Sequence, residues 1–173
     1  MSDTKRKFET IYRETQKFRQ WWLWMIVLVG PVFTLGVLAR HIFGYGAIDD
    51  GLNDITITLI VVFIIGLIFP VFLLVMRLES QVTGQGLCIR FRPFHWKWII
   101  IPFEKIKLAE PLMYRPLRDY GGWGIRYGKM GKAYNVSGNR GVLLTFDTGT
   151  PILIGSQNHE LLAATINSKL KYL

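Results

Sequence analysis

Two long stretches without a charged side chain constrain the fold of this chain more than any other feature. Residues 21–39 and 55–76 contain no Asp, Glu, Lys, Arg or His. At 1.5 Å per helical residue, each stretch is long enough to cross a hydrocarbon core of about 30 Å. The sequence therefore predicts a hairpin of two transmembrane helices over residues 21–76. Because neither stretch holds an ionisable residue, no ion or proton pathway is expected through it.

The charges that flank these stretches predict an orientation. Residues 1–20 hold six basic side chains, whereas residues 40–54 hold one Arg and three Asp. Since basic flanks stay on the cytoplasmic side, the pattern predicts an integral plasma-membrane protein with both termini in the cytoplasm. Two interpretations of the basic segment 1–20 stay open, a helix over residues 5–20 that lies on the membrane surface and a plain topology signal.

The remaining residues, 77–173, are predicted to form one cytoplasmic domain. They carry 14 basic and six acidic side chains, so most of the net charge of +9 lies here. Short β runs separated by turn residues predict a meander over residues 78–83, 87–91 and 96–102.

The clearest local pattern in this domain is a β-hairpin followed by a helix. Residues 141–146 and 151–155 flank the turn sequence Asp147-Thr148-Gly149-Thr150. After the hairpin, Ser156 or Asn158 is expected to cap a helix that runs to about Lys169. Leu162, Ile166 and Leu170 recur every four residues and would form its apolar stripe.

The same residues carry a resemblance to a known family. The stretch 141–166, with Ile154-Gly155-Ser156 leading into the helix, resembles the last hairpin and helix of prokaryotic pleckstrin-homology-like domains, and Ile101-Pro102-Phe103-Glu104-Lys105-Ile106 resembles an upstream strand of that family. The resemblance covers about residues 77–170. It implies an α+β membrane protein, in which a two-helix transmembrane hairpin precedes a mostly antiparallel β barrel or sandwich with a C-terminal α-helix. This scaffold hosts lipid binding, peptide binding and structural roles, so the resemblance implies a fold more than an activity.

The segment from Tyr120 to Arg126 is the first candidate binding site. It places three glycines beside Trp123, and basic side chains follow it. One interpretation is a recognition loop for an acidic partner or lipid headgroup, and the other is that Trp123 packs in the core while the glycines form a bend. The candidate residues are Tyr120, Gly121, Gly122, Trp123, Gly124, Arg126, Lys129 and Lys132.

A second candidate set consists of aromatic and basic residues expected at a membrane interface. Residues 90–98 alternate the two kinds of side chain, which is typical of an interface and less so of a site for single-stranded nucleic acid. The set comprises Trp21, Trp22, Trp24, Arg90, Arg92, Trp96, Lys97 and Trp98.

No convincing catalytic, metal or cofactor site follows from the sequence. Cys88 and the three histidines lie far apart. Asp147-Thr148-Gly149 matches the tripeptide of aspartic proteases, so a dimeric protease that uses Asp147 stays open as an alternative.

The sequence therefore predicts a membrane-anchored, non-enzymatic interaction or assembly module. The expected partners are anionic lipid headgroups, another membrane protein or a second copy of the chain, and not nucleic acid. Besides the dimeric protease, an accessory subunit of a membrane transport complex is an alternative function.

Overall fold

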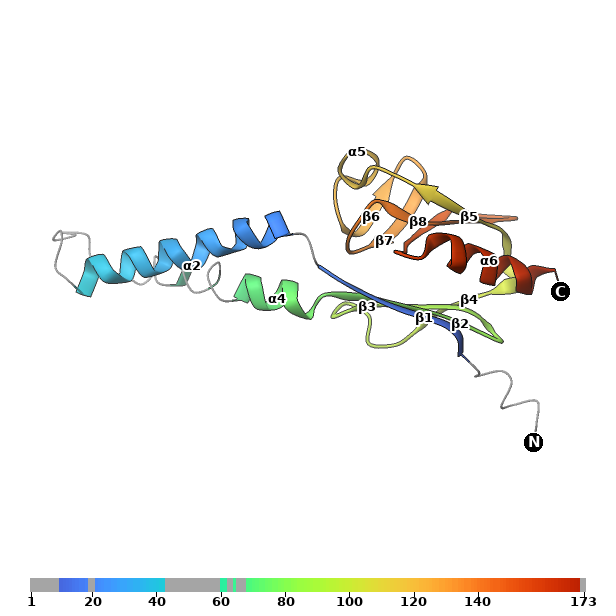
Figure 1. Cartoon of the computed structure of the whole chain (residues 1–173), viewed down its shortest axis with the longest axis horizontal. Helices are drawn as coiled ribbons and strands as arrows, with labels where there is room; N and C mark the ends of the chain where they lie inside the picture. Colours follow the sequence, from blue (N-terminus) through green and yellow to red (C-terminus); the bar gives the residue numbers. More distant parts are fainter. Residues whose placement is uncertain (1–9, 19–20, 43–59, 62–63, 65–67, 172–173) are drawn as a thin grey trace, which may run out of the picture. The chain divides into compact units, whose positions relative to one another are not determined.

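The computed structural model describes residues 10–18, 21–42, 60–61, 64 and 68–171. The chain divides into two compact units, one of residues 1–18 and 76–173 and the other of residues 19–75. The first unit is rich in β structure and the second is helical (Figure 1). Each unit is described separately below.

The helical unit differs from the predicted transmembrane hairpin. Helix α2 spans Trp21–Ile42 and contains Pro31, and helix α4 spans Phe69–Val75. Among the described parts of the chain, no helix is both long enough and apolar enough to cross a membrane. This finding contradicts the two predicted spans, 21–39 and 55–76. Helix α4, which lies within the second predicted span, extends only about 10 Å over its seven residues. Residues 55–59, 62–63 and 65–67 of that span lie outside the described residues.

The predicted location in the membrane is contradicted together with the transmembrane hairpin. Integration into the plasma membrane and the cytoplasmic placement of both termini were inferred from the two spans and their charged flanks, and the absence of a spanning helix among the described residues contradicts that inference. The predicted fold class, an α+β membrane protein, is wrong for the same reason. Residues 1–9 and 43–59, which hold many of the flanking charges, lie outside the described residues.

The first sheet of the β-rich unit has four antiparallel strands in the order β1-β2-β3-β4. Strands β2, β3 and β4 form the predicted meander. Strand β1 was not predicted, and a surface helix over residues 5–20 is wrong for the strand's residues, because Tyr12 and Gln16 are buried on one strand face. The strands are β1 (Thr10–Lys17), β2 (Arg77–Thr83), β3 (Gly86–Arg92) and β4 (Ile99–Pro102).

Strands β1 and β2 pair directly although the helical unit separates them in sequence. Their register ends with Lys17 opposite Arg77. Residues 18–76 therefore leave the sheet and return to it at one end of a single strand pair, as the loop of a hairpin does. The helical unit is an insertion into a β-hairpin.

The second sheet has five strands in the order β5-β8-β9-β7-β6, and β7 and β9 are parallel. The short helix η2 (Phe103–Lys105) connects the two sheets. Strands β8 and β9 form the predicted hairpin, which is confirmed. The strands are β5 (Ile106–Met113), β6 (Gly124–Gly128), β7 (Gly131–Asn135), β8 (Arg140–Phe146) and β9 (Ile152–Gly155).

Helix α6 (His159–Leu170) confirms the predicted C-terminal helix. It packs against β5 and β8 and also contacts β1 of the other sheet (Figure 1). Leu162 and Ile166 of the predicted stripe are fully buried, whereas Leu170 is half-buried. The Asn167 side chain accepts a hydrogen bond from the Ala109 N–H and donates one to the Ala109 carbonyl, so the helix is tied to the β5 backbone.

The predicted side-chain cap of α6 is absent, because Ser156 has a different partner. Asn158 occupies the cap position and makes no side-chain capping bond. The Ser156 hydroxyl instead donates to the Glu14 carboxylate at 2.6 Å, and the Gln157 N–H donates to it at 2.8 Å. The Tyr12 hydroxyl donates to the same carboxylate at 2.6 Å, while burial raises the pKa of Tyr12 to about 12 and Glu14 adds to this. Glu14 thus joins β1 to the segment that begins α6.

The hairpin insertion predicts that the β-rich unit folds without the helical unit. If residues 18–76 are replaced by Asn-Gly between Lys17 and Arg77, the strand pair gains a two-residue turn that fits its twist. We expect a dispersed amide NMR spectrum and a cooperative thermal transition. Adding Glu14→Ala to the shortened chain should lower the transition midpoint, since four donors, those of Tyr12, Gln16, Ser156 and Gln157, lose their acceptor. A shortened chain without a cooperative transition would contradict the insertion.

Candidate functional site

The glycines of the first candidate segment end a helix and turn the chain into a strand. Helix α5 spans Pro116–Tyr120, and Gly121 follows it with a left-handed φ of 70°. The Gly121 N–H donates to the Leu117 carbonyl, and the Gly122 N–H donates to the Pro116 carbonyl. Gly122 and Gly124 also have positive φ values, 131° and 120°. Glycine is the residue that adopts such angles without strain, so the segment has a clear conformational role.

Tyr120 and Trp123 are held by contacts within the unit. Tyr120 is buried against Tyr114, with the two rings edge to face at 5.8 Å, and both pack on Ala133. The Trp123 Nε1–H donates to the Gly138 carbonyl at 3.0 Å. The glycines form a bend and Tyr120 lies in the core, whereas Trp123 is half-buried at the surface of the unit.

The basic residues after this segment reach the surface of the β6–β7 hairpin. Arg126 and Lys129 are exposed, and Lys132 is half-buried. The Lys132 ammonium lies 4.7 Å from the centre of the Tyr134 ring and 5.5 Å from that of Tyr127, its partner across the strand pair. Interaction with Tyr134 raises the pKa of Lys132, although burial acts in the opposite direction. Lys132 is therefore a cation held between two tyrosine rings.

Part of the second candidate set lies in the loop between β3 and β4. Trp96 has 85% of its surface exposed, Phe94 has 56%, and Lys97 is exposed as well. Such an exposed tryptophan is unusual, because a large apolar ring is unfavourable in water. Exposed aromatic side chains of this kind are often part of a contact surface. Trp96 is the most exposed large apolar side chain of the β-rich unit among the described residues.

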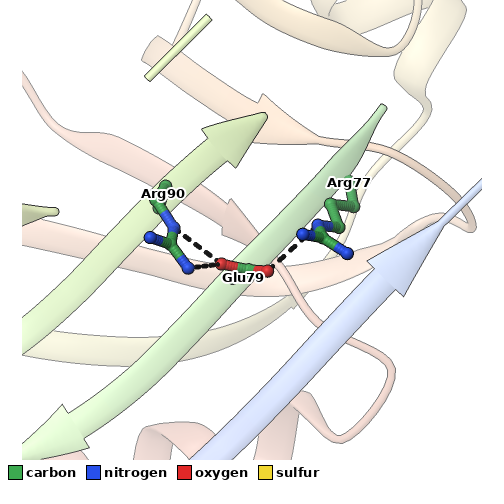
Figure 2. A network of polar contacts seen from close by, with 3 residues as sticks. All are labelled: Arg77, Glu79 and Arg90. Atoms are coloured by element: carbon green, nitrogen blue, oxygen red, sulfur yellow. Dashed lines mark hydrogen bonds and ion pairs between the residues drawn. The ribbon is translucent and has the colours of Figure 1, made fainter. Parts of the chain in front are cut away.

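Arg90 and Trp98 anchor this loop to the sheet. The Glu79 carboxylate, only 5% exposed, accepts a hydrogen bond from Arg90 Nε at 2.7 Å and forms ion pairs with Arg90 Nη2 at 2.5 Å and Arg77 Nε at 3.0 Å (Figure 2). The Arg90 guanidinium also lies 4.3 Å from the centre of the Trp98 ring. Arg90 therefore has its partners within the unit, and this network fixes the positions of the residues from which the loop extends.

His95 brings the two candidate sets together. Its ring lies 5.9 Å from that of Tyr134, so the β3–β4 loop contacts strand β7. Burial lowers the pKa of His95, and the nearby Lys132 lowers it further. We call the resulting region the basic–aromatic surface and define it by Phe94, His95, Trp96, Lys97, Tyr127, Lys129 and Lys132.

The basic–aromatic surface has no acidic residue of its own. Residues 90–98 and 120–146 contain no Asp or Glu. In the described parts of the chain, no carboxylate lies within ion-pair distance of Lys97, Lys129 or Lys132. The surface therefore offers uncompensated positive charge beside exposed aromatic rings, a combination that attracts acidic groups.

Several predicted residues lie elsewhere, and several members of the surface were not predicted. Trp21, Trp22 and Trp24 begin helix α2 of the helical unit, and Arg92 is half-buried at the end of β3. The candidate sets left out Tyr127, and they left out Phe94 and His95 although the alternating run 90–98 contains both. For Tyr127, the available signal was its spacing from Lys132 and Tyr134. A short hairpin with this spacing places the three side chains on one face.

No catalytic arrangement is found among the described residues. Asp147 is exposed in the turn between β8 and β9, Cys88 is buried, and His159 begins α6. The same residues contain no group of three His, Cys, Asp or Glu side chains that could hold a metal ion. No family model, curated protein or solved structure matches the chain.

The buried network predicts that Glu79 stabilises the unit. Glu79→Ala leaves two guanidinium groups without their acceptor, and removal of one partner from a buried ion pair costs about 3 kcal/mol. Urea denaturation should show this loss in the free energy of unfolding. Glu104→Ala, at an exposed position, is the control and should change it by less than about 0.5 kcal/mol. Equal stability of the two variants would contradict the anchoring role.

Proposed function

We propose that the β-rich unit is a non-enzymatic interaction module that binds an acidic protein partner through the basic–aromatic surface. The observation that carries the proposal is the meeting of two segments, residues 93–98 and 126–134, at the contact between His95 and Tyr134. Together they present exposed aromatic rings and cations without a neighbouring carboxylate. Tryptophan and tyrosine dominate the binding energy of protein interfaces, and the cations would select an acidic partner.

A protein partner fits this surface better than a lipid headgroup layer does. Attraction to an anionic bilayer depends mainly on how many cations lie near it, at about 1 kcal/mol each. Here the position of one cation is fixed, since Lys132 lies beside two tyrosine rings, and the neighbouring loop extends from Arg90 and Trp98, which contact each other. Fixed positions lower the entropic cost of binding a partner of definite shape.

The sequence resemblance of residues 141–166 to prokaryotic pleckstrin-homology-like domains supports a binding role, because that family includes peptide binders. The alternative of a dimeric protease has less support. It requires two Asp147 carboxylates to meet, whereas Asp147 lies in an exposed turn that its Thr-Gly-Thr sequence suits.

The proposal predicts that an acidic partner depends on Trp96 and Lys97. The full chain would be purified with its partners from its native cells and compared with the Trp96→Ala, Lys97→Ser variant by quantitative mass spectrometry. We expect one partner at near-stoichiometric amount, with a loss of binding of about 30-fold in the variant, as for a tryptophan hot spot. Binding of the purified partner should also weaken as the salt concentration rises.

Two matched variants make this experiment decisive. Leu117→Ala, Lys107→Ser removes one exposed apolar and one exposed basic side chain elsewhere, and should retain the partner. Asp147→Asn should retain it too, whereas the protease alternative requires loss of a proteolytic activity. Retention of the partner by the Trp96→Ala, Lys97→Ser variant, or co-purification of acidic lipid alone, would overturn the proposal.

A further inference from the structure

Lys132 is the most enclosed cation of the basic–aromatic surface. Its ammonium lies over the rings of Tyr127 and Tyr134, and His95 packs on Tyr134 from the opposite segment. The other two lysines of the surface, Lys97 and Lys129, are exposed. Within the described residues, Lys132 has aromatic contacts and no carboxylate partner.

His95 supplies a second polar group at the same point. Its Nδ1 atom is buried and has no hydrogen-bond partner among the residues that the structure describes. Because the protein encloses that atom, an incoming carboxylate would meet the ring at Nε2. A protonated imidazole donates from both nitrogens, so in that state His95 Nε2 would donate a hydrogen bond to an anion.

We propose that Lys132 and His95 form the seat of a single carboxylate from the acidic partner, and that protonation of His95 strengthens its binding. The inference rests on the proposed function, because the partner's aromatic or aliphatic groups would lie on Trp96 and Tyr127 while its carboxylate enters the seat. The buried Tyr134 ring shields one side of the ion pair from water and so strengthens it.

The direction of the pH dependence follows from the groups that face His95. Lys132 and Tyr134 face it from β7, and in its own segment it is flanked by Arg92 at the end of β3 and by Lys97 in the loop. Burial and the positive charge of Lys132 lower the pKa of His95, so the free protein keeps it neutral at neutral pH. A bound carboxylate offsets the charge of Lys132 and favours the protonated imidazole. Proton uptake therefore accompanies binding, and affinity rises as the pH falls.

Short peptides test the seat directly. The full chain would be titrated with the blocked peptide Phe-Glu-Phe and with its uncharged counterpart Phe-Gln-Phe, by NMR, between about pH 8 and about pH 5.5, where the glutamate stays ionised. We expect the Glu peptide to bind about tenfold more tightly at the lower pH and the Gln peptide to show no such change. The His95 ring signals should shift only with the Glu peptide.

Variants separate this inference from the proposed function. Lys132→Met keeps the stem between the tyrosines and should remove the preference for the Glu peptide, whereas Lys105→Met, at an exposed position, should not. His95→Asn should remove the pH dependence while binding persists. A pH dependence that survives His95→Asn, or equal effects of Lys132→Met on both peptides, would overturn the seat.

The partner experiment and a lipid control complete the test. If the partner is lost with Trp96→Ala, Lys97→Ser but retained by Lys132→Met, the interaction module stands and the seat is wrong. If the chain binds vesicles that contain phosphatidylserine, ignores vesicles of phosphatidylcholine alone and binds neither peptide, both the protein partner and the carboxylate seat are overturned.

Discussion

The carboxylate of Glu14 is the interaction on which the arrangement of the β-rich unit depends. It accepts hydrogen bonds from Tyr12 on its own strand and from Ser156 and Gln157 before the last helix. It therefore joins the first strand of the unit to its C-terminal segment. With β1 held in this way, β2 pairs beside it, and the residues between them leave as one insertion. The same contact fixes where α6 begins, and Asn167 then ties that helix to β5.

A second buried carboxylate connects the core to the surface. Glu79 lies inside the first sheet and holds Arg90, and Arg90 in turn stacks on Trp98 at the base of the β3–β4 loop. A buried ion pair contributes little net stability compared with apolar packing, but it specifies geometry, because a guanidinium that must face a carboxylate and a ring has few alternatives. The exposed Trp96 therefore projects from a fixed base.

Sequence patterns predicted the elements whose signals lie within a few residues, and they missed the elements that depend on residues far apart in the sequence. The β8–β9 hairpin follows from Asp147-Thr148-Gly149-Thr150, and α6 follows from its apolar spacing, because both signals lie within a few residues. Strand β1 was not predicted, because its partner β2 follows in the sequence only after the inserted segment. Apolar length alone suggested two membrane spans, a prediction that the described helices contradict. The candidate site was predicted as two separate sets, and the contact between His95 and Tyr134 joins them in the folded unit.

The way in which the cations are held explains why this surface is suited to binding. In the first sheet, the guanidinium groups of Arg77 and Arg90 share the Glu79 carboxylate as an ion-pair partner. At the basic–aromatic surface, Lys132 is positioned by tyrosine rings, which orient a cation without cancelling its charge. A lysine paired with a carboxylate would have to exchange that partner for a new one, with little net gain. A lysine positioned by rings keeps its full attraction for an incoming carboxylate, so the fold orients the charge and leaves it available.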